Sequence, residues 1–250
     1  MLDNVVNSDS NTHLKRQRHV ESQLFNVVLC HHYIDLTTLL FRIDPYLKEF
    51  DATIVSVDEN LVVLDRTCFY PSCGGQVGDT GTISGVRVRD TLREDMEVRH
   101  IIEDNIGFRT GQVVHGVIDW DSRYRIMRLH SASHLVFYSM KEVFGNGCVP
   151  ASSGQLDYVK DRSDYLFDTP FDKGKLADVE SRVNGLIADG LPITHGLESD
   201  GERLLWRVSL FPGMECGGTH VRNTAEIGHI TIKRGSKPGK GRERIELTLA

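Results

Sequence analysis

The stretch DWDSRYRIMRLHSASHLVFYSMKEVFGNG, residues 119–147, divides the chain into two unlike halves. It predicts a helix from about residue 123 to residue 144, because cap-forming residues at 119–122 precede it and Gly145-Asn146-Gly147 follows it. Short strand patterns fill the chain before this helix, whereas strands alternate with a second helix after it. We therefore expect a domain boundary between residues 118 and 119.

The segment before the helix predicts a small all-β unit. Short apolar runs interrupted by Gly, Asn and Asp are typical of strands, and they span 52–57, 61–64, 86–90, 98–103 and 112–118. We expect a β-barrel-like domain over residues 37–118. Residues 1–36 are rich in Asn, Ser, Asp and His and show no sustained period, so we expect a disordered N-terminal extension there.

The segment after the helix predicts an α+β domain over residues 119–250. A second helix is expected at 175–189, where apolar residues share one face and Gly190 and Pro192 end the pattern. Strand patterns occur at 165–167, 192–195, 207–210, 229–233 and 244–249. The fold class is therefore α+β, with helices packed on a mostly antiparallel sheet.

The composition excludes fibrous and membrane-spanning proteins. Of the 250 residues, 40% are hydrophobic and 26% are charged, which is typical of soluble globular chains. No apolar run approaches the ~20 residues of a spanning helix, so no membrane partner is expected. The five cysteines form an odd and sparse set, which favours a reducing compartment and therefore the cytoplasm.

Charge is distributed unevenly along the chain. The formal net charge of −6 argues against indiscriminate binding to nucleic acid. Residues 222–244, however, hold seven basic and two acidic residues, Lys233, Arg234 and Arg242 among them. This segment could dock a phosphate-bearing partner, or it could be a solvated Gly-rich loop between strands.

Two short motifs supply a set of metal ligands. His130 and His134 are four positions apart in the predicted helix, so both imidazoles emerge on one face. Cys216 and His220 are also four positions apart, and two glycines between them allow a tight bend. Three imidazoles and a thiolate match zinc in ligand type and number. Four protein ligands favour a structural site, whereas their wide separation in sequence favours a catalytic one, and the sequence leaves this choice open.

A Gly-rich segment lies in the predicted β unit. Residues 68–81, CFYPSCGGQVGDTG, place four glycines after the strand pattern at 61–64. Such a segment can approach a ligand closely and present backbone N–H groups, or it can form a simple tight turn.

The three motifs together carry a family resemblance. FYPSCGGQVGDTG, RLHSASHL and CGGTHV, in this order, resemble the editing region of alanyl-tRNA synthetase. Across residues 37–250 the chain most resembles the free-standing AlaX proteins that keep the glycine-glycine loop. This resemblance implies a trans-editing hydrolase that cleaves the aminoacyl ester of tRNA(Ala) mischarged chiefly with serine, with glycine as a further candidate.

The resemblance also implies site residues. Zn2+ would be held by positions matching His130, His134, Cys216 and His220, which would form the catalytic centre. Gly74 and Gly75 would lie near the acyl pocket. Substrate contacts are further expected from two serines of the following segment and from three basic residues of the C-terminal segment: Ser152, Ser153, Lys233, Arg234 and Arg242.

Several alternatives remain open at this level. Ser152 and Ser153 could be ordinary loop residues rather than acyl contacts. The zinc ion could activate water, or it could orient the ester against a water held by other groups. Two functions of other classes also fit the motifs: a non-catalytic tRNA-binding module with structural zinc, and a zinc hydrolase of small esters.

Overall fold

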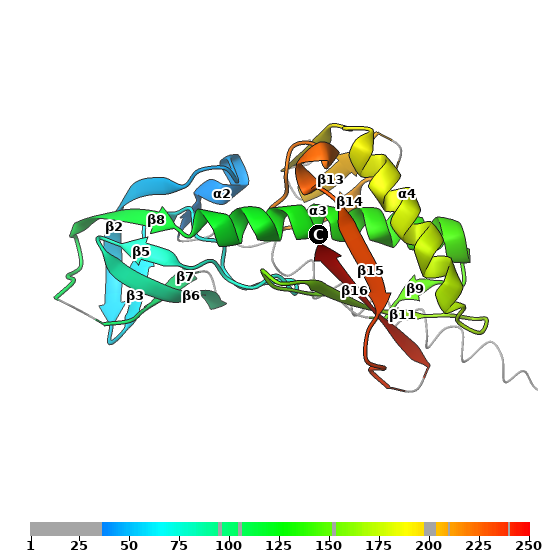
Figure 1. The fold of residues 1–250 in the computed structure, drawn as a ribbon. Helices are drawn as coiled ribbons and strands as arrows, with labels where there is room; N and C mark the ends of the chain where they lie inside the picture. Colours follow the sequence, from blue (N-terminus) through cyan, green and yellow to red (C-terminus); the bar gives the residue numbers. More distant parts are fainter. Residues whose placement is uncertain are drawn as a thin grey trace, which may run out of the picture.

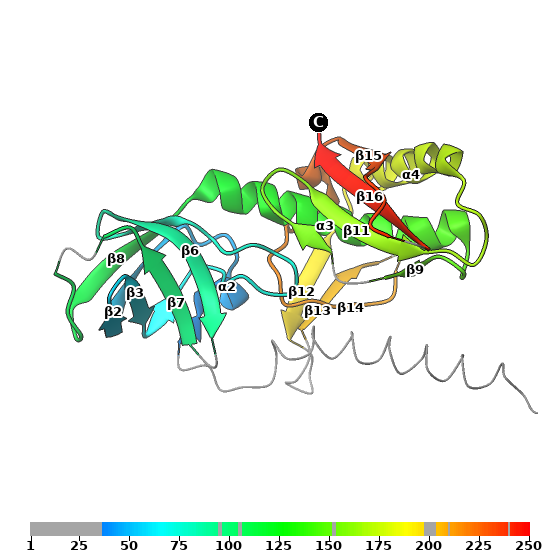
Figure 2. The same cartoon turned by 90° about the horizontal axis from the view of Figure 1, so that it is seen from below.

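The computed structural model describes residues 37–94, 97–104, 107–151, 154–197, 204–209, 211–239 and 241–250. The expected extension over residues 1–36 lies outside the described residues. The protein has a β unit at one end and a mixed unit of helices and sheets at the other, and one long helix runs between them (Figures 1 and 2). Among the described residues, no helix combines the length and the apolar character that crossing a membrane requires.

The β unit is a ring of six antiparallel strands. The ring closes because β8 pairs with β5 on one side and with β2 on the other. Its order is β2 (Glu49–Asp58), β3 (Leu61–Leu64), β7 (Glu97–Ile102), β6 (Val86–Glu94), β5 (Gly81–Ile83) and β8 (Val113–Ile118). Buried and exposed residues alternate along β2, β6 and β8, which directs the apolar side chains into the ring. The five strands expected in this segment are present, and the three-residue β5 was not anticipated.

Small elements lie beside the ring. A parallel pair joins β1 (Thr38–Leu39) to β4 (Arg66–Thr67), and the four-residue helix α2 (Leu40–Ile43) follows β1 directly. Phe41 of α2 packs edge-on against Tyr70 at 5.3 Å between ring centroids. This packing gives the Gly-rich segment an apolar support at its beginning.

Helix α3 (Trp120–Phe144) begins three residues before the predicted start. Asp119 occupies the position before it, but its side chain makes no capping hydrogen bond; its carboxylate lies 3.7 Å from the Arg87 guanidinium instead. Gly145, with φ of +83°, ends the helix as expected. The helix leaves the end of β8 and runs into the middle of the C-terminal half (Figure 1).

The C-terminal half holds two antiparallel sheets and a second long helix. The larger sheet consists of β10 (Gln155–Leu156), β11 (Asp161–Leu166), β16 (Arg242–Leu249) and β15 (Ile230–Arg234), with β9 (Val149–Pro150) also paired to β11. The smaller sheet consists of β12 (Ile193–Leu197), β13 (Leu204–Val208) and β14 (Met214–Glu215). The α+β class is thereby confirmed, and α4 (Leu176–Ala188) matches the helix expected at 175–189.

One apolar core fills this half. It combines the inner face of α3, with Met127, Leu129 and Leu135 all fully buried, with residues of α4 and of the larger sheet. Two short 3₁₀ turns, η1 (Lys173–Lys175) and η2 (Thr224–Ile227), complete the connections. The apolar face of α3 is therefore packed into this core, and the two histidines of the helix lie beside the core.

Candidate metal centre

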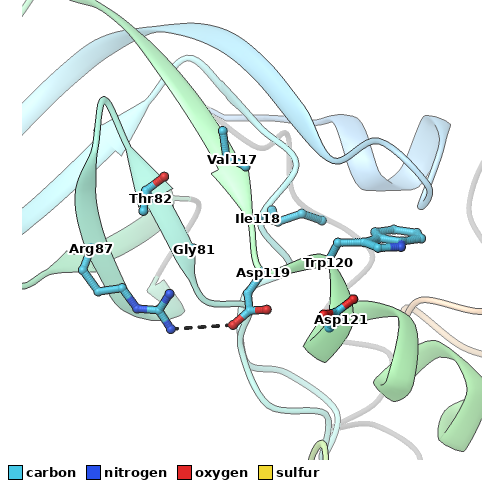
Figure 3. A pocket seen from close by; sticks show the side chains of 8 residues that line it. All are labelled: Gly81, Thr82, Arg87, Val117, Ile118, Asp119, Trp120 and Asp121. Carbon is cyan, nitrogen blue, oxygen red and sulfur yellow. Dashed lines mark ion pairs between the residues drawn. The ribbon is translucent and has the colours of Figure 1, made fainter.

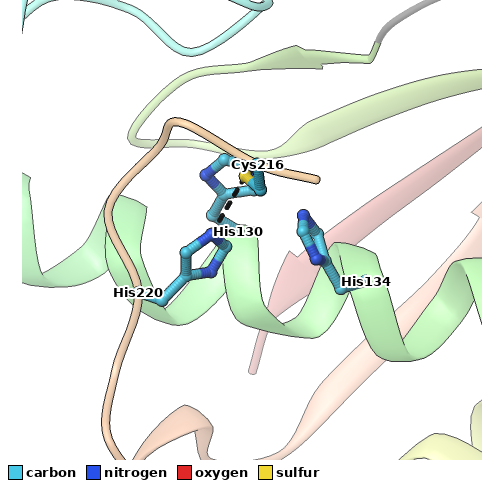
Figure 4. A group of neighbouring side chains, drawn as sticks. All are labelled: His130, His134, Cys216 and His220. Atoms are coloured by element: carbon cyan, nitrogen blue, oxygen red, sulfur yellow. Dashed lines mark hydrogen bonds between the residues drawn. The ribbon is translucent and has the colours of Figure 1, made fainter. Parts of the chain in front are cut away.

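The four predicted ligands come together in space. His130 and His134 project from α3, while Cys216 and His220 lie on the loop between β14 and η2 (Figure 4). One ligand atom from each of these residues lies within 4.8 Å of all the others. His134, Cys216 and His220 are buried and His130 is half-buried, so the cluster is screened from solvent.

Hydrogen bonds orient two of the imidazoles. The Nδ1 atom of His130 lies 2.8 Å from the Oε1 atom of Gln76. Because that amide oxygen can only accept, Nδ1 carries the hydrogen and Nε2 is free to face the cluster. The Nε2 atoms of His130 and His220 lie 3.5 Å and 3.1 Å from the Sγ atom of Cys216. On its other side, His220 contacts the Ser131 hydroxyl at 3.2 Å.

The three imidazoles of the cluster have the protonation state that metal ligands need. Burial lowers the pKa of His130 to about 3, and burial together with the neighbouring histidines holds the pKa values of His134 and His220 well below their usual range. All three imidazoles are therefore neutral and able to donate a lone pair. Burial also raises the pKa of the Cys216 thiol to about 12, a shift that a bound cation would reverse.

Two of the ligand-to-ligand distances are near those of a tetrahedral ion. Ligands held at ~2.0–2.3 Å from zinc lie roughly 3.3–3.7 Å from one another, close to the two sulfur-to-nitrogen distances given above. Three nitrogens and one sulfur are also the donor set that zinc accepts. His134 Nδ1 is buried and has no hydrogen-bond partner among the described residues. The residues present therefore fit the metal that the motifs predicted.

Glycine is required where the Cys216–His220 loop passes His130. A Cβ atom at Gly218 would lie 2.2 Å from Cε1 and 2.5 Å from Nδ1 of His130. Such contacts are impossible without moving the imidazole. Glycine at position 218 therefore lets the loop pass close to the His130 side chain of α3. The two glycines anticipated from sequence as bend-formers thus include one that provides steric clearance for a ligand.

The Gly-rich segment approaches the cluster through Gln76. The Gln76 amide donates to the Thr219 hydroxyl at 3.1 Å, and its oxygen accepts from the Thr219 backbone N–H at 3.2 Å. Gly75, with φ of +90°, passes so close to Gly154 that a Cβ atom on Gly75 would lie 1.9 Å from the Gly154 carbonyl oxygen. Backbone hydrogen bonds of Gly75 and Val77 with Leu156, at 2.8 Å and 3.1 Å, fix this segment against β10.

Three residues beside the ligands were missed by the sequence interpretation. Gln76 directly follows the glycine pair, and that position in the motif was the available signal. Ser131 lies within the His130–His134 motif, and its hydroxyl also accepts the Val221 N–H at 3.2 Å. His195, on β12, contacts the Cys216 carbonyl oxygen at 2.7 Å, and its ring lies 5.0 Å from that of His220. No local pattern in the sequence marks His195.

The remaining predicted substrate contacts either lie on the β15–β16 hairpin or fall outside the described residues. Ser152 and Ser153 are outside the described residues. Lys233 and Arg234 lie on β15, exposed, and Arg242 begins β16. Within this hairpin Lys233 is 3.5 Å from Glu246 and Arg234 is 2.6 Å from Glu243, so part of the local positive charge is already balanced.

A separate pocket lies where the ring meets the start of α3 (Figure 3). It has a volume of about 380 Å³, and the Arg87–Asp119 ion pair crosses it. Its lining consists of Gly81, Thr82, Arg87, Val117, Ile118, Asp119, Trp120 and Asp121. None of these residues belongs to the metal cluster.

Comparisons with known proteins extend over most of the chain. Residues 5–122 match the family described as tRNA synthetases class II (A), and residues 215–246 match the threonyl and alanyl tRNA synthetase second additional domain. The chain is 35% identical over 217 residues to the alanyl-tRNA editing protein AlaX-M of Pyrococcus horikoshii, with 86% of this chain and 99% of that protein covered.

Other relatives agree with this match. The AlaX-M protein of Saccharolobus solfataricus is 33% identical, again with 86% of this chain and 99% of the relative covered. The alanine–tRNA ligase of Methanococcus vannielii is 30% identical across 92% of this chain, which corresponds to 28% of the ligase. The chain therefore belongs to the AlaX-M family of alanyl-tRNA editing proteins.

Proposed function

We propose that this protein hydrolyses, in trans, the aminoacyl ester of tRNA(Ala) mischarged with serine, with glycine as a second substrate. The observation that carries the proposal is the buried His130–His134–Cys216–His220 cluster, held against the Gly-rich segment through Gln76. Family membership indicates the class of reaction, and the cluster is the proposed site at which that reaction takes place.

The metal we propose for this cluster is Zn2+. His130, His134, Cys216 and His220 would hold it, three through neutral imidazoles and one through a thiolate. A zinc ion bound there can polarise a carbonyl group or lower the pKa of a water molecule. The four ligands are also the proposed catalytic residues. Hydrogen bonds with Gln76 and Ser131 fix two of the imidazoles on the side facing away from the cluster.

Positioning is the main task for the residues of this chain. An aminoacyl ester is already an activated acyl group, so holding it in line with a water supplies much of the acceleration. The Gly-rich segment at Gly74 and Gly75 allows an acyl group to approach the cluster without obstruction from side chains. Ser152 and Ser153 are proposed contacts for that group. A hydrogen bond to the serine hydroxyl would then distinguish seryl from alanyl esters.

We propose that the basic β15–β16 hairpin contacts the tRNA backbone through Lys233, Arg234 and Arg242. Support comes from the exposure of the first two side chains on this hairpin. Neutralising these three residues should weaken tRNA binding and reduce its dependence on salt.

The organisation we propose is a β domain over residues 37–118 and a metal-holding domain over 119–250, acting in the cytoplasm. Each part has an apolar core of its own, one inside the ring and one between α3, α4 and the larger sheet. The Gly-rich segment and α3 connect the two parts.

The first experiment compares deacylation of Ser-tRNA(Ala), Gly-tRNA(Ala) and Ala-tRNA(Ala) by native, chelated and zinc-restored protein. We expect rapid loss of the serine ester, slower loss of the glycine ester and little loss of the alanine ester. Chelation should abolish these reactions and zinc should restore them. Folded, zinc-loaded protein that does not exceed the spontaneous rate would favour a tRNA-binding module with structural zinc. Hydrolysis of small esters without tRNA binding would favour a zinc esterase.

A further inference from the structure

A buried carboxyl group lies outside the metal cluster without a role in the proposed mechanism. Asp161 is the first residue of β11 and only 5% exposed. Its neighbours across the sheet are Leu156 on β10 and Leu247 on β16, and both belong to the apolar core. A carboxylate in such surroundings loses much of its hydration, so its retention calls for a physical reason.

Polar neighbours surround the Asp161 carboxyl, but no cation is bonded to it. Ser163 donates to its Oδ2 atom at 2.8 Å, and the Ser133 hydroxyl forms a second hydrogen bond. Arg162 is turned to the other face of the strand, where its guanidinium lies 2.6 Å from Asp157. In the described part of the chain, no ion pair includes Asp161. The carboxyl therefore has donors that favour its ionised form, but it has no ion-pair partner among the described residues.

The same carboxyl lies next to the segments that carry the metal cluster. Ser133 is on α3, between His130 and His134. On another side, a Cβ atom at Gly154 would lie 2.9 Å from Asp161 Oδ1, so the carboxyl occupies the space in which a side chain at residue 154 would begin. Gly154 is in turn the residue against which Gly75 packs, and Gln76 follows. Asp161 is therefore enclosed by the ligand-bearing turn of α3 and by the strand that supports the Gly-rich segment.

We propose that Asp161 binds the α-ammonium group of the aminoacyl ester, and this inference rests on the hydrolytic function proposed above. Every aminoacyl ester carries this cation on the carbon next to the reacting carbonyl. The ammonium group supplies an ion-pair partner for the carboxylate, and Ser133 and Ser163 hold the carboxylate in one orientation. Fixing the ammonium group fixes the adjacent carbonyl relative to the metal cluster.

The first test replaces the ammonium group in the substrate. Seryl-tRNA(Ala) is compared with glyceroyl-tRNA(Ala), in which a hydroxyl stands in place of the α-amino group, each rate divided by its spontaneous hydrolysis. Wild-type protein should prefer the seryl ester by about tenfold or more, because a charge-assisted hydrogen bond is lost with the analogue. Asp161→Asn should bring this preference close to one while leaving zinc content and unfolding temperature unchanged.

Asp164→Asn is the matched control. Asp164 is also buried on β11, but it faces the other side of the sheet and pairs with Arg244 at 2.8 Å and 3.1 Å. This variant should retain the wild-type preference for the ammonium-bearing ester. An Asp161→Asn variant that loses the same factor on both esters would show that Asp161 is a structural residue, and would overturn the inference.

The second test uses pH. Burial raises the pKa of Asp161 to about 7, and the hydrogen bonds from Ser163 and Ser133 and the Arg162 charge oppose this rise. Tyr165, four residues along the same strand, is the other titratable neighbour, and leucines flank the group on β10 and β16. Because the ammonium group binds the ionised carboxylate, kcat/KM for the seryl ester should rise with pH through about 7.

The rise of kcat/KM with pH is the acid limb of the pH profile. Ser163→Ala removes a donor that stabilises the carboxylate, so this acid limb should move to higher pH. Asp161→Asn should lack the limb. A limb at the same pH in wild type and in both variants would overturn the inference. Absence of seryl ester hydrolysis by wild-type protein would instead overturn the proposed function, and the inference with it, which keeps the two failures distinguishable.

Discussion

Gln76 shows how a single side chain connects two distant segments. Its amide oxygen accepts from His130 and from the Thr219 backbone, and its NH₂ group donates to the Thr219 hydroxyl. One amide therefore fixes a proposed metal ligand from α3 and the loop that supplies two others. Hydrogen-bond partners of this kind set ligand orientation and raise metal affinity.

We predict that Gln76→Ala lowers zinc affinity by about 10–100-fold, because the His130 imidazole loses the acceptor that fixes its Nδ1–H. Competition with a chromophoric chelator measures this directly. Gln155→Ala is the control, since Gln155 is exposed on β10, and its affinity should equal that of the wild type. Equal affinities for all three proteins would contradict the role given to Gln76.

A second buried residue, His100 on β7, makes the stability of the ring sensitive to acid. Its Nδ1 atom lies 2.9 Å from the Val62 carbonyl oxygen and its Nε2 atom 2.9 Å from the Thr67 hydroxyl. Burial lowers the pKa of His100 from 6.5 to about 4. Between these values the unfolded chain binds a proton that the folded protein excludes, so stability rises with pH across this window.

We predict that acidification from pH 6.5 to pH 4 removes up to about 3 kcal/mol of folding free energy through His100. His100→Gln keeps hydrogen-bonding capacity but does not titrate, so its stability should fall less over the same range. Urea unfolding at several pH values, with zinc present throughout, gives the difference between the two proteins. His115→Gln changes an exposed residue of the ring, and its unfolding free energy should follow that of the wild type through the lower part of this pH window. If the unfolding free energy of His100→Gln fell with pH as steeply as that of the wild type, the prediction would be rejected.

At the scale of elements, the Gly-rich segment depends on two glycines in different ways. Both have positive φ, +60° at Gly74 and +90° at Gly75. A Cβ atom at Gly74 meets open space, whereas one at Gly75 meets the Gly154 carbonyl oxygen. The first position therefore requires only the left-handed conformation, while the second also requires close backbone contact with the strand region.

We predict that Gly74→Ala costs about 1–2 kcal/mol of stability, the usual expense of a left-handed conformation for an L-residue. Gly75→Ala should cost more, because the segment must also move away from Gly154 and weaken its hydrogen bonds to Leu156. Chemical denaturation ranks the two variants. Equal losses of stability for the two variants would mean that the segment can move away from Gly154 at residue 75 without weakening its hydrogen bonds to β10.

At the scale of the whole molecule, a buried ion pair joins the ring to α3. Arg123, on the first turn of α3, and Asp79, at the end of the Gly-rich segment, are almost completely inaccessible to solvent. Arg123 also donates to the carbonyl oxygens of Pro45 and Cys68 at 3.0 Å and 2.6 Å. Asp79 accepts from the Tyr70 backbone N–H at 2.6 Å. The Arg123 contacts connect segments that are remote in sequence, whereas the Tyr70–Asp79 bond lies within the Gly-rich segment.

We predict that Arg123→Met lowers stability by about 3–5 kcal/mol, because an uncompensated carboxylate stays buried. Adding Asp79→Asn to that variant should restore part of the loss. Arg182→Met serves as the comparison, since the Arg182–Glu142 pair is exposed and should contribute less than about 1 kcal/mol. Denaturant unfolding of the four proteins tests this, and a small loss for Arg123→Met would show that the junction tolerates the change.

The sequence by itself determined the elements and the donor set. Alternating burial in β2 and β6, the apolar face of α4 and the glycine that ends α3 are local properties, which neighbouring residues encode. The four predicted ligands are likewise recognisable from their spacing of four. Strand limits shifted by a few residues, and the three-residue β5 was missed because so short a run has no period of its own.

Only the tertiary structure decided which segments meet. Closure of the ring needs β8 to pair with β2 and β5, and a hydrophobic pattern shows which face is buried but not what covers it. The His130–Gln76 contact spans 54 positions, and the burial of Asp161 depends on strands from both ends of the C-terminal half. Such contacts follow from the packing of the whole chain, so spacing within a motif carries no information about them.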